Sequence, residues 1–470
     1  MSQHLFNELY KTFERQKNAF SSMPYPSYKK RIQDLKRLRE LVLQYQGALA
    51  KAVSEDFGGR CVEETLLSEI FQVIQTIDYV CKHLRGWMKK QKRHTSILFQ
   101  PAKSFVYYQP LGVVGIISPW NYPVLLTLSP LVYALASGNN VCLKISEYTP
   151  KTFQVIKEIC KRCFEVSQVA VFIGDTLFSK AFCEVNFDHL LFTGSTQTGK
   201  KVYQAASQNL TPVTLELGGK SPLIIDRDYP VKKAAKTICF SKGMNAGQTC
   251  IAPDYVLVPE DKLDELISAL QAGFNKMYPD YLNNPQYTSI LQVSHFQRLN
   301  DQLSQAKTSG CKVIPLAKIE KQTDGNKKMP LTLVINPDIS LDVMQGEIFG
   351  PILPILTYHE YHDALSTINK NTNPLALYLL SHNKATQAFF LENTQSGGVC
   401  INDAIVHIAQ HALPFGGVGD SGMGRYHAKE GFITFSNIKS IFQRKKWNPA
   451  ALLYPPYGKL FKGFKRLFIR

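Results

Sequence analysis

Short apolar runs alternate with amphipathic segments along most of this chain of 470 residues. The first such region predicts strands over 113–117, 141–145, 169–173, 189–193 and 213–217, with helices over 124–136, 151–164 and 196–206. Apolar strands separated by helices indicate a parallel sheet covered on both faces. Ligands of such sheets bind at the carboxyl ends of the strands, and the residues that follow predicted strands here include Asn121, Ser146, Gly194 and Gly218.

A second alternating region follows residue 250, with strands predicted over 255–258, 331–335 and 352–358 and a helix over 261–277, while residues 1–93 predict mainly helix. The predicted fold is therefore α/β, with two Rossmann-like, doubly wound parallel-sheet domains and a small oligomerisation or bridging element. The expected boundaries are 1–95 with 105–220 for the first domain, 221–415 for the second, 96–104 with 416–446 for the bridging element, and 447–470 for a C-terminal tail.

Residues 104–143 contain no Asp, Glu, Lys, Arg or His, a pattern that could also indicate a membrane-spanning helix. Several helix-breaking residues interrupt this stretch, namely Pro110, Pro119, Pro123 and Pro130 with Gly112 and Gly115. We therefore expect a buried strand, a turn, a helix and a second strand rather than a span.

The composition is that of an ordinary soluble protein, with 44% hydrophobic and 19% charged residues. Residues 1–10 show no secretion signal, and ten cysteines without short regular spacing favour a reducing compartment, with the cytoplasm as the expected location. The net charge is +17, but eight basic residues lie in 441–470, which has no acidic residue, so the other 440 residues carry only +9. The charge is thus largely a property of the tail and predicts no nucleic-acid partner.

Three motifs carry residue types that suit covalent acyl-type chemistry. Cys250 ends the segment Gly-Gln-Thr-Cys, Glu216 begins Glu-Leu-Gly-Gly-Lys, and Asn121 lies in Pro-Trp-Asn-Tyr-Pro. These side chains would supply a nucleophile, a base and an oxyanion donor. A cysteine alone is more often an inert buried thiol, so the combination carries the interpretation.

Six motifs in order resemble NAD(P)-dependent aldehyde dehydrogenases over nearly the whole chain. They are the three above, Phe192-Thr193-Gly194-Ser195-Thr196, Glu347-Ile348-Phe349-Gly350-Pro351 and Pro414-Phe415-Gly416-Gly417-Val418. The short N-terminus and basic tail look like the class 3 branch, which includes fatty and aromatic aldehyde enzymes. A weaker similarity to bacterial coniferyl aldehyde dehydrogenases lies in Phe57-Gly58-Gly59-Arg60 and Glu63-Glu64-Thr65.

This resemblance implies a reaction and roles for the motif residues. Cys250 would attack the aldehyde, Asn121 would stabilise the oxyanion, and Glu216 would activate the water that releases the acid from a thioester. The substrate expected is an aromatic aldehyde of the cinnamyl or coniferyl type or a medium- to long-chain aliphatic aldehyde. The alternatives are a relative that passes the thioester to coenzyme A, against which Glu216 argues, and a catalytically silent membrane-scaffold protein, for which no key residue is missing.

The resemblance also implies a cofactor site at the carboxyl ends of the first set of strands. The expected NAD contacts are Lys144, Glu147, Gly194, Ser195, Trp120, Glu347 and Phe349. A carboxylate near the ribose favours NAD, whereas the branch often accepts both cofactors, so NADP stays open. Ile145 departs from the proline common at that position of the family. Glu347, expected at the nicotinamide ribose, could share the base role with Glu216.

Substrate and metal predictions rest on less specific signals. The residues expected at the pocket are Tyr122, Phe415 and Asn402, with Asp403 and Phe349 as neighbours, although such aromatics are equally typical of a core. Cys160 with Cys163, and His407 with His411, lack the further ligands of a metal site, so we expect no metal.

The tail combines an apolar stripe with basic residues. Leu460, Phe461, Phe464, Leu467 and Phe468 share one helix face, between Lys459, Lys462, Lys465, Arg466 and Arg470. This pattern predicts either contact with an anionic membrane surface or packing on a partner subunit. The class 3 resemblance implies a homodimer, with 432–442 as a candidate contact.

Overall fold

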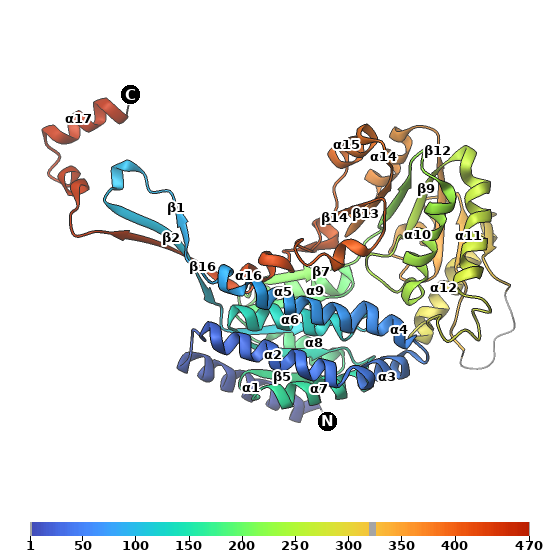
Figure 1. Cartoon of the computed structure of the whole chain (residues 1–470), viewed down its shortest axis with the longest axis horizontal. Helices are drawn as coiled ribbons and strands as arrows, with labels where there is room; N and C mark the ends of the chain where they lie inside the picture. The colour runs from blue at the N-terminus through green and yellow to red at the C-terminus, as the bar shows by residue number, and fades with distance from the viewer. Residues whose placement is uncertain (1, 319–325, 470) are drawn as a thin grey trace.

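The computed structural model describes residues 2–318 and 326–469, which form three β-sheets (Figure 1). The first domain contains a six-stranded sheet in the order β15–β7–β6–β3–β4–β5. Its strands are β3 (Val113–Ile117), β4 (Asn140–Ile145), β5 (Val169–Ile173), β6 (His189–Thr193), β7 (Val213–Glu216) and β15 (Gly422–Met423). All neighbours are parallel except β15, which pairs antiparallel with β7. The predicted strands are confirmed to within one residue at each end.

The second domain contains a seven-stranded sheet in the order β10–β11–β12–β9–β8–β13–β14. Its strands are β8 (Pro222–Ile225), β9 (Tyr255–Pro259), β10 (Lys312–Pro315), β11 (Thr332–Ile335), β12 (Ile352–Tyr358), β13 (Ala376–Leu380) and β14 (Gly398–Ile401). Only β10 runs antiparallel to its neighbour. The α/β class with two parallel-sheet domains is confirmed.

Helices cover both sheets. The first domain is covered by α1 (Ser2–Ser22), α2 (Tyr28–Gln44), α3 (Gln46–Phe57), α4 (Val62–Thr65), α5 (Phe71–Trp87), α6 (Leu125–Ser137), α7 (Pro150–Cys163), α8 (Thr176–Glu184) and α9 (Thr196–Ser207). The second domain carries α10 (Val231–Gly243), α11 (Leu263–Met277), α12 (Val293–Thr308), α13 (Asp342–Gln345), α14 (Tyr361–Lys370) and α15 (Lys384–Asn393). Between α4 and α5 the chain makes a π-helical turn, Leu66–Ile70.

The uncharged stretch from 104 to 143 is interior structure. Helix α6 contains Pro130, and every one of its residues is buried because it lies between the sheet and the helices α2 and α5. Its C-terminus is closed by Gly138 in the left-handed region. Among the described residues, no helix has both the length and the hydropathy needed to cross a bilayer.

A third, antiparallel sheet projects from the body of the molecule (Figure 1). Its strands are β1 (Gln91–Arg93), β2 (Ala102–Pro110) and β16 (Ser436–Arg444), which follows helix α16 (Ala428–Thr434). The predicted division at residue 104 falls inside β2, which continues to Pro110. Helix α17 (Lys459–Phe468) lies beyond this sheet, and Arg470 of the predicted tail lies outside the described residues.

The strand register brings the candidate motifs together. Ile117 of β3 pairs with Lys144 of β4 on one side and with Phe192 of β6 on the other. The turns after these three strands, which carry Asn121 and Gly194 among others, therefore leave the sheet at the same edge.

Candidate active site

The turn that carries Cys250 follows α10 and begins with three left-handed residues. Asn245, Ala246 and Gly247 have φ angles of 50°, 49° and 73°. A Cβ on Gly247 would overlap the carbonyl oxygen of Gly350. The Gly-Gln-Thr-Cys motif therefore requires glycine at its first position, for both its conformation and its close contact.

The buried side chain of Gln248 anchors this turn. Its Nε2 donates to the carbonyl oxygens of Asn245 and Ser289, both at 3.0 Å, and its Oε1 accepts the Leu291 N–H at 3.0 Å. The amide thus uses both donors and its acceptor, which fixes the backbone two residues before Cys250.

The Asn121 turn of the first domain is bonded directly to the cysteine turn of the second. The buried Nδ2 of Asn121 donates to the carbonyl oxygen of Gln248 at 3.2 Å, and the Tyr122 hydroxyl lies 2.8 Å from Oγ1 of Thr249. The two motifs, far apart in sequence, therefore place an amide and a thiol at one site.

The surroundings of the Cys250 thiol disfavour the thiolate. Burial raises the pKa of Cys250, and the negative charges of Glu347 and then Glu216 raise it further. The backbone N–H groups of Cys250 and Ile251 oppose this shift by hydrogen bonding to the sulfur. The thiol is thus protonated at neutral pH and has two carboxyl groups nearby that can take its proton.

Glu216, at the end of β7, is 2% exposed. Within the described residues neither of its carboxylate oxygens has a hydrogen-bond partner. Burial raises the pKa of Glu216 well above its ordinary value, although the positive charge of Arg425 opposes the shift. A buried carboxylate without hydrogen-bond partners binds a proton more strongly than an exposed one, which suits a general base.

Glu347 reaches across to the glycines that follow Glu216. The Gly219 N–H donates to the Glu347 carboxylate, and a Cβ on Gly218 would overlap that carboxylate. Burial raises the pKa of Glu347 to about 8; Asp254 raises it too, while Lys242 opposes. The two carboxyl groups therefore share one region, and the glycines of the Glu-Leu-Gly-Gly-Lys motif provide the space.

Aromatic and histidine rings surround Phe415. Its ring centroid lies 5.4 Å from that of His427 and 6.2 Å from those of His407 and Tyr426. Burial lowers the pKa of His407 to about 4 and that of His427 to about 3, so both rings are neutral at pH 7. In the described part of the chain, neither ring nitrogen of His407 has a hydrogen-bond partner.

Asn402, which is predicted at the substrate pocket, has a structural contact in the loop after β14. It has a φ of 63°, and its Oδ1 accepts the Ser381 N–H at 2.9 Å. Asp403 accepts the N–H of the next residue, Ala404, at 2.8 Å. Both side chains therefore stabilise the loop after β14, and the amide oxygen of Asn402 is already bonded.

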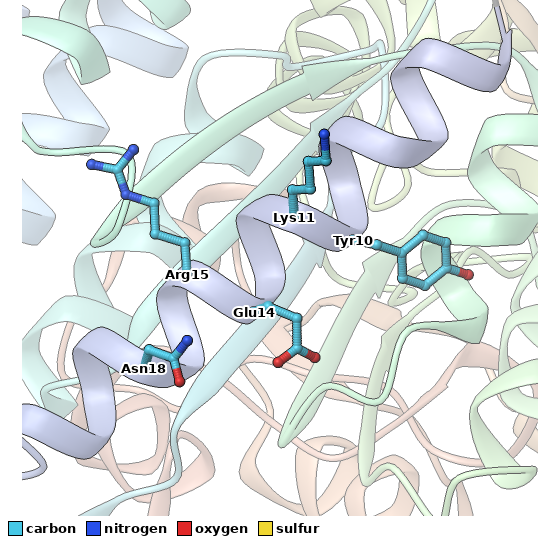
Figure 2. A pocket seen from close by; sticks show the side chains of 5 residues that line it. All are labelled: Tyr10, Lys11, Glu14, Arg15 and Asn18. Carbon is cyan, nitrogen blue, oxygen red and sulfur yellow. The ribbon is translucent and has the colours of Figure 1, made fainter.

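A surface hollow on helix α1 lies elsewhere. Figure 2 shows that its lining comes from one helix, α1, through Tyr10, Lys11, Glu14, Arg15 and Asn18. These side chains project along one exposed side of that helix and include none of the motif residues, so this hollow is not the site described above.

Comparison with known proteins shows the family of the chain. The sequence profile of the Aldehyde dehydrogenase family matches residues 7–441. A probable coniferyl aldehyde dehydrogenase from Pseudomonas aeruginosa is 46% identical over 470 residues, covering 100% of this chain and 98% of the relative. A 4,4'-diaponeurosporen-aldehyde dehydrogenase from Staphylococcus aureus is 37% identical and covers 98% of this chain and 99% of the relative.

The chain belongs to the aldehyde dehydrogenase family. The solved structure of the substrate-bound state of Staphylococcus aureus AldH has a TM-score of 0.92 at 36% identity, covering 98% of this chain and 99% of that one. An NAD-dependent aldehyde dehydrogenase from Sinorhizobium meliloti has a TM-score of 0.86 at 26% identity, covering 94% and 88%. The protein is an NAD(P)-dependent oxidoreductase that acts on aldehydes.

The residues expected at the cofactor of this dehydrogenase fit a dinucleotide. Lys144, at the end of β4, donates to Oε2 of Glu147 at 2.8 Å, and Glu147 is partly exposed, which provides a donor and an acceptor for a ribose. Ser195 caps the N-terminus of α9, where a phosphate would meet free backbone N–H groups. The Trp120 ring lies 5.3 Å from that of Phe349.

Sequence reasoning missed several residues at the site of this dehydrogenase. Burial raises the pKa of Tyr426, and the neighbouring Glu216 and Cys250 raise it further, which indicates that its ring lies near both side chains. Arg425 donates to the carbonyl oxygens of Gly397 and Gly416 at 3.0 and 2.9 Å. The only sequence signal for them was their place shortly after the Pro-Phe-Gly-Gly-Val motif.

Proposed function

We propose that this aldehyde dehydrogenase oxidises an oxygenated aromatic aldehyde of the cinnamyl type to its acid through a covalent intermediate on Cys250. The observation that carries the proposal is the bonding of the Asn121 turn to the Cys250 turn, with Glu216 and Glu347 beside the thiol. A nucleophile, an oxyanion donor and a base then lie at one site.

The first step requires transfer of the thiol proton to a carboxylate. The Cys250 thiolate then attacks the carbonyl carbon and forms a thiohemiacetal. Asn121 Nδ2 has a second proton that can stabilise the developing oxyanion, together with the Cys250 backbone N–H. One such donor is typically worth about 3 kcal/mol.

Bound NAD⁺ supplies the hydride acceptor for the oxidation. Lys144 and Glu147 would hold its adenosine ribose, Gly194 and Ser195 its pyrophosphate, and Trp120, Phe349 and Glu347 its nicotinamide half. Glu216 would then activate the water that hydrolyses the Cys250 thioester. Because the Glu216 oxygens lack partners within the described residues, hydrolysis is favoured over transfer to coenzyme A.

The surroundings of Phe415 support an oxygenated aromatic substrate over a fatty one. An aromatic ring would stack among Phe415, Tyr426 and His427, and the neutral His407 offers one donor and one acceptor for a phenolic substituent. A fatty chain would leave these nitrogens unpaired and buried, which is costly. Tyr122 would contribute to the same pocket through its ring.

The test compares NADH formation by the wild type, Cys250→Ala and a control, Cys311→Ala, with hexanal, dodecanal, benzaldehyde and 4-hydroxy-3-methoxycinnamaldehyde. We expect the phenolic aldehyde to give the highest kcat/KM, Cys250→Ala to lose all turnover, and Cys311→Ala to retain it. Turnover by Cys250→Ala would refute the covalent step. A wild-type preference for dodecanal would refute the substrate class.

We further propose that the protein is a homodimer formed through the projecting sheet. Phe432, at the start of the predicted contact, is buried against Trp87 and Tyr108 of its own chain and is not available. Ile438 and Phe442 of β16, in contrast, are 53% and 50% exposed. They lie on the same face of an exposed strand, which suits pairing with a second copy.

The C-terminal tail, residues 447–470, is proposed to contact an anionic lipid surface at the cytoplasmic side of a membrane. Leu460, Leu467 and Phe468 of α17 are 62%, 69% and 52% exposed, and the helix carries basic residues at 459, 462, 465 and 466. An exposed apolar stripe beside cationic side chains is typical of interfacial helices.

A further inference from the structure

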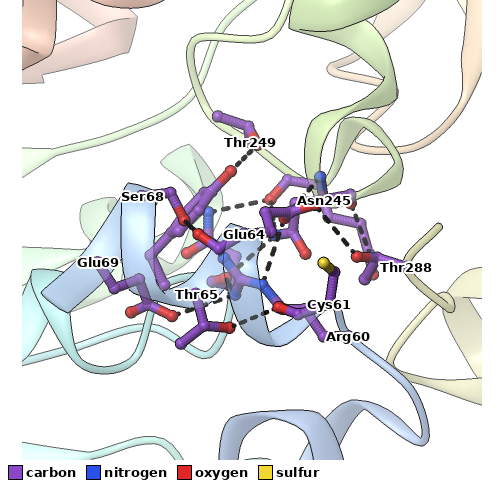
Figure 3. A network of polar contacts seen from close by, with 12 residues as sticks. Arg60, Cys61, Glu64, Thr65, Ser68, Glu69, Asn245, Thr249 and Thr288 are labelled. Atoms are coloured by element: carbon purple, nitrogen blue, oxygen red, sulfur yellow. Dashed lines mark hydrogen bonds and ion pairs between the residues drawn. The ribbon is translucent and has the colours of Figure 1, made fainter. Parts of the chain in front are cut away.

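A buried arginine lies next to the Asn121 turn and is not part of the chemistry above. Arg60 precedes α4, its side chain is 0% exposed, and it stands at the centre of a polar network (Figure 3). Its Nη1 donates to the carbonyl oxygen of Asn121 at 2.9 Å, and its Nη2 donates to Oγ of Ser68 at 3.2 Å. The guanidinium thus holds the backbone of the proposed oxyanion donor.

Two carboxylates pair with Arg60 and extend the network in opposite directions. Glu69, on the π-helical turn, lies 3.2 Å from Nη1, and its other oxygen accepts the N–H groups of Val124 and Leu125 at 2.7 and 3.0 Å. This contact fixes the start of α6, the helix that follows the Asn121 turn. π-Helical turns of this kind often occur at functional sites.

Glu64 makes the second connection, across the domain boundary. It lies 3.3 Å from Nε of Arg60, and its Oε1 accepts the Asn245 N–H at 2.9 Å. Its Oε2 lies 3.4 Å from Oγ1 of Thr288. Asn245 begins the left-handed turn that leads to Cys250, so Arg60 is connected to the thiol turn through a single carboxylate.

The aromatic neighbours of Arg60 complete the contact with both turns. The guanidinium lies 4.6 Å from the ring of Tyr122 and 5.2 Å from that of Phe57. The Asn121 carbonyl also accepts Nδ2 of Asn245 at 3.1 Å. The carbonyl oxygen of Asn121 therefore connects the Asn121 and Asn245 turns, and it accepts a hydrogen bond from Arg60 as well as from Asn245.

Burying three ionised groups is expensive, and well-packed apolar residues are often at least as stabilising. The buried guanidinium donates to the Asn121 carbonyl and to Ser68 Oγ and pairs with two carboxylates, which gives a directional rigidity that an apolar cluster lacks. Two backbone segments from different domains must keep an amide and a sulfur in register, and a misplacement of about 1 Å can cost about 10²-fold in rate.

We propose that Arg60 is a positioning residue for the covalent step, acting with Glu64 and Glu69 to hold the Asn121 amide against the Cys250 turn. Arg60 contacts neither substrate nor cofactor in this role, and the proposal rests on the function proposed above. Its loss should slow thiohemiacetal formation and the hydride transfer that follows, and should leave dinucleotide affinity unchanged.

The test is single-turnover NADH formation in Arg60→Met and Arg60→Lys, with Arg31→Met as a matched control. Arg31 is also buried, stacks on a ring (Tyr25, 5.0 Å) and donates to a backbone carbonyl (Ala136, 2.9 Å) at the opposite end of α6. We expect Arg60→Met to lower the single-turnover rate by about 10²-fold. NAD⁺ affinity, read by fluorescence titration, should be as in the wild type, and Arg60→Lys should recover part of the rate because it keeps the charge.

Arg31→Met should lose comparable thermal stability but keep the wild-type rate. An unchanged rate in Arg60→Met, or an equal loss in Arg31→Met, would overturn the positioning role. If Arg60→Met does not fold, Glu64→Gln provides the second variant, because it retains shape and loses the charge that links Arg60 to Asn245; it should slow the same step. A wild type that forms no NADH from any of the aldehydes would instead refute the proposed function itself.

Discussion

At the scale of single residues, two buried carboxyl groups lie beside the Cys250 thiol. Cys250 reacts only as a thiolate, yet burial and both carboxylates raise its pKa. This arrangement is compatible with thiolate formation if the carboxylates accept the thiol proton. Transfer of that proton to Glu216 or Glu347 removes the negative charge that opposes the thiolate. In the mechanism proposed above, catalysis would begin with a proton transfer among these three buried groups.

This charge arrangement predicts how substitution changes thiol reactivity. A negative neighbour raises the pKa of Cys250, so its removal must lower that pKa and shift the pH profile of iodoacetamide alkylation to lower pH. The shift should be larger for Glu347→Gln than for Glu216→Gln, because Glu347 contributes more to raising the thiol pKa. With its own pKa of about 8, Glu347 is ionised in the alkaline range where the thiol titrates. A shift to higher pH would contradict this charge distribution.

At the scale of elements, the site depends on turns more than on helices or strands. The strands bring turn residues to one edge, and left-handed residues then reverse the chain tightly enough for two domains to touch. At Gly247, beside the cysteine turn, both the backbone conformation and the contact with Gly350 exclude a side chain.

Comparison of Gly247→Ala with Gly310→Ala separates the cost of a left-handed conformation from the cost of steric overlap. Gly310 has a φ of 82°, but among the described residues, its chain neighbours aside, no atom lies within 4 Å of the position that a methyl group would take, so its substitution should cost only conformational strain, roughly 1–2 kcal/mol. Gly247→Ala adds overlap with a carbonyl oxygen and should cost more in the free energy of unfolding, measured by urea titration, and should lower activity. An equal loss in the free energy of unfolding for both variants would show that the backbone at Gly350 can move away at no cost.

At the scale of the whole molecule, two compact domains contain the chemistry while the third sheet and α17 project from them (Figure 1). The projecting parts hold the exposed apolar residues of β16 and α17 and much of the excess positive charge. Isolated exposed strands and amphipathic helices gain little stability alone, so this region is suited to contacts outside the chain.

Deletion of residues 447–470 tests the two proposed contacts together. The truncated protein should stay dimeric in light scattering, because β16 is retained, and should no longer sediment with vesicles containing anionic lipid. Turnover of a short soluble aldehyde should be unchanged, since no site residue is removed. Sedimentation equal to that of the full chain would refute the membrane role, and a monomer would assign the tail to the subunit interface.

The sequence alone determined the elements and the identities of the main candidate groups. Strands such as 113–117 and 189–193 were predictable because short apolar runs between helical segments, and the helix-breaking residues near them, are local signals. The motifs around Asn121, Glu216 and Cys250 were also visible, because their residue types suit one chemistry wherever they meet. Their roles stay predictions until the variants above are measured.

Only the tertiary structure decided which groups share a site and in what charge state. Burial and neighbouring charge set the pKa of Glu347, and neither is a property of the residues beside it in the chain. The pairing of Arg60 with Asn121 joins residues 61 positions apart, and the rings around His407 come from separate segments. Such contacts depend on how the domains pack, and local sequence patterns do not specify distances between residues that are far apart in the chain.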